Sequence, residues 1–166
     1  MLSIEHSGER HLTVAEERIF RFLDSNATEY EVLEHPAVYT CTIMARLLKT
    51  GENSIAKSLI TKNNDERDLL AVLPGGMKVD FVRLAKGAGV RSSSLASLKE
   101  AEIVAGCQVG CVYPFGNLMN IPTYFDRNLL DSKYVFFNPG SHNKSVRIRT
   151  EDLRKLSMAE LKEFAV

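Results

Sequence analysis

The spacing of apolar residues predicts helices separated by short strands. A capping-box pattern over Thr13–Glu16 precedes apolar residues at helical spacing, which predicts a first helix over about 14–24. Gly51 is expected to cap the second helix, and Ser97–Glu100 is a second capping box. The later helices are expected at about 43–50, 79–88, 98–105 and 150–160.

Runs rich in β-branched and aromatic residues predict the strands. The runs at 54–61 and 69–73 flank a polar turn and read as a hairpin, and the second is apolar on both faces, as a central strand is. The run at 145–149 alternates polar and apolar residues, as an exposed or edge strand does. Further strands are expected at 30–34, 123–126 and 134–137. Strands and helices interleave irregularly, which predicts a mixed α/β (α+β) fold.

Lys57 lies in the middle of the first hairpin strand. In an extended chain Lys57 shares a face with Ile55 and Leu59, while Ser58 and Ile60 take the other face. A buried ammonium group is costly without a partner. Two interpretations stay open from these residues alone: a lysine at the strand's rim that reaches water, or a lysine that holds an anionic ligand in a cleft.

Composition indicates one globular domain over residues 1–166, with 45% hydrophobic and 25% charged residues. Lys and Arg total 21, as do Asp and Glu, so the net charge is zero and a strongly basic nucleic-acid-coating protein is excluded. No apolar run is long enough for a membrane span, and residues 1–6 do not resemble a signal peptide, so we expect a cytoplasmic protein. A local basic patch remains open, with candidates Arg46, Lys49, Lys57, Lys62 and Lys78.

The cysteines and histidines predict neither a metal site nor a cofactor. Three cysteines cannot all pair within one chain, so free thiols are expected. Cys107 and Cys111 have no nearby Cys or His to complete a zinc set, and no basic neighbour to lower their pKa for nucleophilic attack. The four histidines, at 6, 11, 35 and 142, are scattered along the chain.

Two loops rich in glycine and proline, 110–116 and 138–142, are candidates for chemistry. Such a loop can direct backbone N–H groups at an oxyanion, although loops with two glycines are also common as plain turns. His142 is a proton carrier or a turn cap, and His35 either bonds neighbouring backbone or lines a cleft. The chain contains neither a Gly-x-Ser-x-Gly elbow nor a P-loop.

The order of these features resembles a known family. Five segments match its motifs in register over about residues 14–157: 34–37, 56–60, 70–76, 110–116 and 137–142. On these segments the chain is identified as a member of the YbaK/prolyl-tRNA synthetase-associated editing domain family, the trans-editing aminoacyl-tRNA deacylases.

The resemblance implies a bent, mostly antiparallel central sheet surrounded by helices. It implies hydrolysis of the ester on mischarged tRNA, most often tRNA(Pro) carrying Ala, Cys or Ser/Thr, with water or a ribose hydroxyl as the attacking group. The acceptor end of aminoacyl-tRNA is then the partner, together with prolyl-tRNA synthetase, and no membrane or metal is involved. Lys57, Gly110 and Pro114 take the catalytic roles, Lys57 by contacting phosphate or substrate and the 110–114 loop by donating to the aminoacyl carbonyl. The implied substrate-binding residues are His35, Ser58, Cys111, Val112, Tyr113, Gly140 and His142.

A second class of function remains open beside the enzyme. A chain that keeps the family's cleft but has lost turnover would be a ligand-binding, RNA-binding or regulatory module. The presence of Lys57 and of both loops favours the enzyme.

Overall fold

The computed structural model describes residues 12–166, so the first six residues, whose sequence gave no sign of a signal peptide, lie outside the described part. Within residues 12–166 no helix is long and apolar enough to cross a membrane. Short 3-10 helices cover Glu52–Ser54, Gly116–Leu118 and Arg127–Asp131. The α-helices are α1 (Val14–Ser25), α2 (Cys41–Leu47), α3 (Phe81–Ala88), α4 (Leu98–Ala105) and α5 (Thr150–Leu156).

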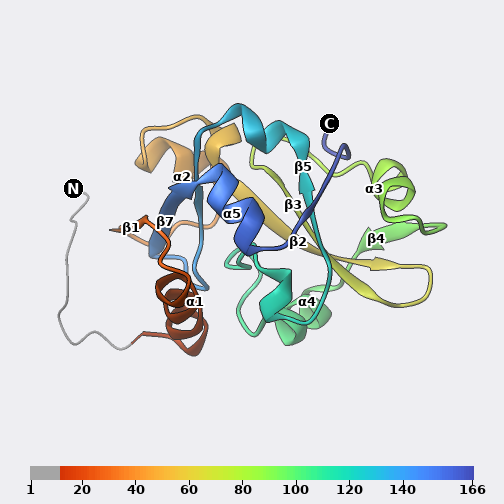
Figure 1. Ribbon diagram of the computed structural model, residues 1–166, viewed down its shortest axis with the longest axis horizontal. Helices are drawn as coiled ribbons and strands as arrows, with labels where there is room; N and C mark the ends of the chain where they lie inside the picture. Colours follow the sequence, from red (N-terminus) through yellow and green to blue (C-terminus); the bar gives the residue numbers. More distant parts are fainter. Residues whose placement is uncertain (1–11) are drawn as a thin grey trace.

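The strands form two sheets that lie next to each other (Figure 1). One sheet has the order β1-β7-β6 and the other the order β4-β2-β3-β5-β8. Four strand pairs are antiparallel, whereas β3–β5 and β5–β8 are parallel. The strands are β1 (Tyr30–Glu34), β2 (Ala56–Asn63), β3 (Asp68–Pro74), β4 (Ser93–Leu95), β5 (Thr123–Asp126), β6 (Tyr134–Phe137), β7 (Lys144–Arg149) and β8 (Glu160–Lys162).

Strand β2 connects the two sheets and forms one wall of the site described below. Near its start, Ile55 makes a parallel bridge to Phe136 of β6, and near its end Thr61 pairs with Leu95 of β4. Strands β6 and β4 therefore approach the same edge of β2 at opposite ends. The predicted mixed α/β fold with mostly antiparallel pairing is confirmed, but the expected central sheet is divided into two at this point.

Several local predictions are confirmed. Strands β2 and β3 form an antiparallel hairpin, and β3 lies in the middle of its sheet with Leu70, Val72 and Leu73 fully buried. The capping box at the start of α4 forms as predicted, since the Ser97 side chain accepts from the Glu100 backbone and the Glu100 side chain accepts from the Ser97 backbone.

Three local predictions are wrong. Strand β7 is not at an edge but lies between β1 and β6. The last helix, expected to run to about 160, ends at Leu156; residues 157–159 form a turn, and Glu160 begins β8, which pairs in parallel with β5. Gly51 does not cap α2, because Leu48 occupies the C-cap and Lys49 adopts the left-handed conformation with φ of 55°.

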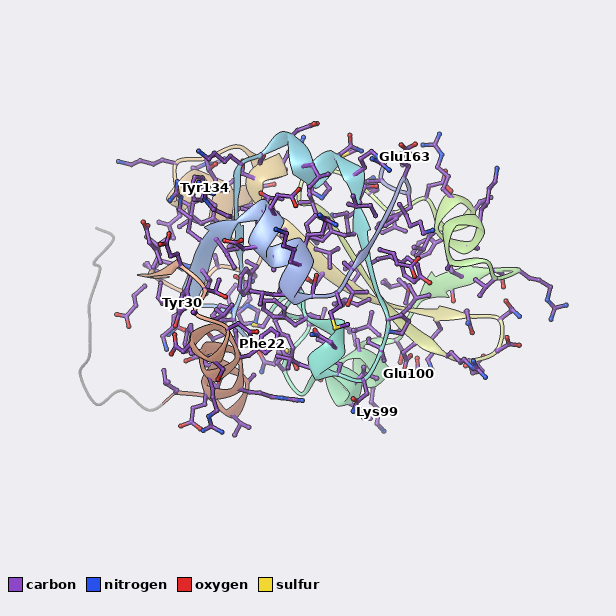
Figure 2. The ribbon with its side chains drawn as sticks, in the orientation of Figure 1. Phe22, Tyr30, Lys99, Glu100, Tyr134 and Glu163 are labelled. Atoms are coloured by element: carbon purple, nitrogen blue, oxygen red, sulfur yellow. The ribbon has the colours of Figure 1, made fainter. Side chains whose placement is uncertain are left out.

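A buried ion pair fixes α1 against the three-stranded sheet. The Thr13 side chain caps α1, but the Glu16 carboxylate does not complete the predicted box; its Oε2 lies 2.5 Å from Lys144 Nζ on β7. Both side chains are nearly inaccessible, so each is the charge partner that the other needs. Figure 2 shows Phe22 on the same helix, and its ring packs edge-on against Phe115 with centroids 5.3 Å apart.

Candidate functional site

A cavity of about 410 Å³ opens at the edge of β2 where the two sheets diverge. Its size falls in the range of small-molecule sites. The walls come from the segment before α2 and its first turn, from β2, from Gly75 after β3, from the β4–α4 region, from the loop after α4, and from Asn138 after β6. These segments are far apart in the sequence. The fold brings them together around the gap that β6 and β4 leave along the edge of β2.

Lys57 lines this cavity from β2 and is half-buried. Its Nζ donates hydrogen bonds to the carbonyl oxygens of Met77 at 2.6 Å and Gly75 at 3.4 Å. Ile55 on the same face belongs to the core cluster beside α2, and Leu59 packs against the cluster beside α3. The lysine is therefore not a side chain extended into bulk water; two carbonyl groups hold it at the cavity wall.

The loop after α4 supplies another part of the wall through Gly110 and Val112. Within residues 12–166 the backbone N–H groups of Gly110 and Val112 donate no hydrogen bond, whereas that of Cys111 donates to the Gln108 carbonyl at 3.0 Å. Pro114 lacks an N–H group altogether, so it cannot donate to a substrate as the resemblance implied for the whole loop. Two residues of the cavity wall thus keep a backbone donor that is available for an oxygen of a ligand.

Asn138 is a cavity residue that sequence reasoning missed. Its side-chain Nδ2 donates to the Gly110 carbonyl oxygen at 2.6 Å, and its residue lines the cavity. The sequence marked the turn over 138–142 but gave no reason to single out the asparagine. The asparagine and the glycine lie in different loops, and local sequence carries no signal for such a contact.

His142 lies behind the cavity rather than in its wall. Its Nδ1 lies 3.2 Å from the Val38 carbonyl oxygen, and its ring centroid lies 4.4 Å from that of Tyr39. A Cβ atom placed on Gly110 would approach His142 Cε1 to 3.2 Å. His142 therefore supports two parts of the cavity wall, the Val38–Tyr39 segment and Gly110.

Five of the predicted residues lie outside the cavity wall: His35, Cys111, Tyr113, Pro114 and Gly140. His35 is buried, with Nε2 2.7 Å from Ser145 Oγ and Nδ1 2.9 Å from the Pro36 carbonyl, so it bonds neighbouring groups as one of the two interpretations held. Cys111 and Tyr113 are each 2% exposed and belong to the core, and Pro114 is also buried. Gly140 has φ of 90°, and a Cβ there would lie 2.6 Å from Ala15 Cβ, so it allows α1 to pack closely.

Ser58 lines the cavity from the face of β2 opposite to Lys57 and is 9% exposed. Its Oγ has no hydrogen-bond partner within residues 12–166. The cavity-lining residues that share its side of the strand, all members of the main core cluster, are Ala56, Ile60, Ala96, Ala101 and Val112. This inner wall is apolar, and three of its members are alanines, which leaves room for a small side chain.

Burial keeps the thiols protonated at neutral pH. Burial, and to a lesser degree Glu102, raises the pKa of Cys107 to about 11, and burial raises that of Cys111 to about 12. Cys41 lines the cavity; burial raises its pKa, while nearby Lys57 acts in the opposite direction. These thiols are poor nucleophiles. Within residues 12–166 no group of His, Cys, Asp or Glu side chains is arranged to hold a metal ion.

The basic residues suggested for a patch do not gather at the cavity. Of these, Lys57 lines it, and Lys62 at the far end of β2 is surrounded by Glu66, Asp68 and Glu100 at 3.5–3.8 Å. The other three, Arg46, Lys49 and Lys78, are exposed outside the cavity wall.

The known proteins that this chain resembles are named as tRNA deacylases or tRNA-editing proteins. The chain is 29% identical over 160 residues to the multifunctional Ser/Thr-tRNA deacylase ProXp-y of Escherichia coli K12, covering 92% of this chain and 93% of that protein. It is 27% identical to the prolyl-tRNA editing protein ProX of Acetoanaerobium sticklandii, covering 90% and 94%. A crystal structure of a candidate trans-editing enzyme for prolyl-tRNA synthetase has the same fold, with a TM-score of 0.83 at 22% identity over 94% of this chain and 99% of that one. Residues 35–156 match the aminoacyl-tRNA editing domain, and the chain belongs to that family.

Proposed function

We propose that this protein is an aminoacyl-tRNA deacylase that acts in trans on mischarged tRNA. The observation that carries the proposal is the cavity itself, which is lined by Lys57 and by Gly110 and Val112, two residues whose backbone N–H groups have no partner within residues 12–166. Such a site offers a cation for a phosphate and two donors for an ester carbonyl. The family to which the chain belongs supports the same chemistry.

In this proposal the ester carbonyl oxygen receives hydrogen bonds from Gly110 and Val112. A water molecule, oriented by the neighbouring ribose hydroxyl, attacks the carbonyl carbon and gives up a proton, and the two donors stabilise the negative charge that develops on the oxygen. The bond between the carbonyl carbon and the ribose oxygen then breaks, and the ribose oxygen takes up a proton. Lys57 anchors the phosphate at the 3′ end, so catalysis rests on positioning rather than on a protein nucleophile.

The predicted residues then divide by role. Lys57, Gly110, Val112 and Ser58 are proposed to touch the substrate, since all four line the cavity. His142 is a positioning residue for the wall. His35, Cys111, Tyr113, Pro114 and Gly140 are proposed to shape the surrounding structure, because they lie outside the wall.

A small wrong amino acid on tRNA(Pro) is the proposed substrate. The alanines of the inner wall support a small side chain, and the names of the two curated relatives point to Ser, Thr and prolyl-tRNA editing. Prolyl-tRNA synthetase, which charges that tRNA, is the proposed protein partner. The proposed location is the cytoplasm, where charged tRNA is used in translation. Residues 1–166 are proposed to form one domain.

The test is deacylation of tRNA(Pro) charged with Ala, Cys, Ser or Thr by the wild-type chain and by Lys57→Met. We expect hydrolysis of at least one of these esters, and a loss of about 100-fold or more in Lys57→Met, as for removal of an essential electrostatic group. Lys99→Ala is the control, because Lys99 projects from α4 at the outer surface (Figure 2) and is exposed.

A binding module is the alternative outcome. If the wild-type chain binds the charged tRNA but hydrolyses none of the four esters, the chain is a non-catalytic module that retains the cleft. If hydrolysis occurs but Lys57→Met retains full activity, the chain is an esterase with its site elsewhere. A denaturant titration of Lys57→Met separates lost chemistry from lost folding, since Lys57 also bonds two carbonyl groups.

A further inference from the structure

Exposed apolar side chains gather at the mouth of the cavity. Tyr39, Leu98, Leu95 and Val109 are 70%, 67%, 57% and 38% exposed, and all four line the cavity. They come from three separate segments: the stretch before α2, the β4–α4 region and the loop after α4. We call these four residues the rim. Single exposed apolar residues are ordinary, but a cluster around a cavity marks a surface that a ligand covers.

Tyr39 differs from the other rim residues because it presents an aromatic face. It is the one aromatic residue among the exposed large apolar residues of the part of the chain that the structure describes. One side of its ring is supported by His142, with the ring planes inclined at 44°. The backbone of the preceding residue is held as well, since Val38 N–H donates to the His142 carbonyl at 3.0 Å.

This support leaves Tyr39 exposed yet positioned. The contact with His142 and the backbone bonds of Val38 fix the segment before a ligand arrives. A platform that is already ordered loses less conformational freedom when it binds, so its contact contributes more to affinity. An aromatic ring presented in this way beside a cavity suits a flat, aromatic ligand group.

We propose that Tyr39 is a stacking platform for the terminal base of the tRNA 3′ end, with Leu95, Leu98 and Val109 packing around that nucleotide. The proposal rests on the proposed function, because the ester held inside the cavity places its own ribose and base at the mouth. The 3′ end is single-stranded, and unpaired bases stack readily on aromatic side chains. The stacking face does not select among amino acids, so the rim holds every charged tRNA while the inner wall selects.

The alternative occupant of the rim is the surface of a protein partner. A protein contact would use the apolar rim without a requirement for an aromatic ring at position 39. If the rim served a protein contact, the affinity for an RNA hairpin would also not depend on its terminal base. These two differences make the protein alternative an outcome of the same experiment.

The experiment measures the affinity of the full chain for an uncharged RNA hairpin with a single-stranded CCA end. Its comparison hairpin is identical except that the last nucleotide is abasic. The variants are Tyr39→Ala, Tyr39→Phe and the control Val82→Ala, whose residue is 80% exposed on α3 and outside the cavity wall. Because stacking contributes substantially per base, we expect Tyr39→Ala to bind the complete hairpin about tenfold more weakly, with Tyr39→Phe and Val82→Ala unchanged.

The abasic hairpin makes the result specific. The wild-type chain should bind it about tenfold more weakly than the complete hairpin, and Tyr39→Ala should bind both hairpins alike. Equal binding of both hairpins by the wild-type chain overturns the proposal, and so does an equal loss for both in Tyr39→Ala, which would indicate a role away from the base. Because the hairpins carry no amino acid, the result is independent of hydrolysis: failure of deacylation contradicts the proposed function, whereas failure here contradicts the stacking role.

Discussion

The side-chain amide of Asn138 donates a hydrogen bond to the carbonyl oxygen of Gly110, with 2.6 Å between Nδ2 and the oxygen. Asn138 follows β6 of the three-stranded sheet, and Gly110 belongs to the loop after α4. Both residues line the cavity. The bond therefore ties the 110–112 loop to the segment after β6. The N–H groups of that loop are the ones proposed to hold the ester.

Replacing Asn138 with alanine should lower the deacylation rate. Without the amide the loop loses its tether, so the donors of Gly110 and Val112 are less well positioned; we expect kcat to fall about tenfold with a smaller change in KM. Asn117→Ala is the control, because Asn117 Nδ2 makes the same kind of bond to the Leu156 carbonyl at 2.9 Å outside the cavity wall. Single-turnover kinetics measure the effect, and an equal loss in both variants would contradict it.

Gly110→Ala and Gly106→Ala form a matched pair. Both glycines have positive φ, 94° at Gly110 and 69° at Gly106, so alanine at either site should reduce the free energy of unfolding by about 1 kcal/mol. The new methyl group meets open space at Gly106 but approaches His142 at Gly110. Of the two variants, we expect only Gly110→Ala to lose deacylation activity. Urea unfolding and deacylation rates measure the two effects, and a comparable loss of activity in Gly106→Ala would show that strain rather than the cavity wall is responsible.

Ser58→Ala should leave the free chain as stable as before, or more stable by about 1 kcal/mol, because it removes a buried hydroxyl without a partner. Ser145→Ala is the contrasting variant, since Ser145 Oγ lies 2.7 Å from His35 Nε2 and both residues are buried. That substitution should cost about 1–3 kcal/mol. Denaturant midpoints measure both, and an equal destabilisation by Ser58→Ala would mean that its hydroxyl has a partner in solution.

The raised pKa values of Cys107 and Cys111 predict loss of stability at alkaline pH. Unfolded thiols release their protons near pH 9, whereas the folded thiols hold them up to about pH 11 and 12. The unfolded state is therefore favoured progressively as the pH rises above 9, and this contribution to stability is intact below that pH. Unfolding of wild type and Cys107→Ala/Cys111→Ala between pH 7 and pH 10.5 tests this; an equally steep decline in the variant would contradict it.

Local sequence predicted those parts of the fold that local interactions decide. The hairpin of β2 and β3 and the capping box of α4 have their signals within a few residues. Strand β7 shows the limit: its alternation of polar and apolar residues is typical of an edge strand, but a middle strand of a small sheet can carry the same alternation. The helix expected to reach about residue 160 stops at Leu156, because the chain turns there and Glu160 begins the pairing of β8 with β5.

The same division applies to the site. Lys57 was conspicuous because a charge in an apolar strand is unusual, and Gly110 because its loop is rich in glycine and proline. Asn138 and Tyr39 gave no comparable signal, since an exposed tyrosine and a turn asparagine are ordinary in sequence. Their importance comes from contacts with Gly110 and His142, which the fold brings close from distant positions.

The most direct test is a crystal structure of the chain with a non-hydrolysable amide analogue of 3′-seryl adenosine 5′-monophosphate. The predicted result has the amide carbonyl oxygen within hydrogen-bond distance of the N–H groups of Gly110 and Val112. It also has the phosphate beside Lys57 and the adenine against Tyr39. An analogue bound outside this cavity, or bound inside it with the carbonyl directed away from the 110–112 loop, would contradict the proposed site.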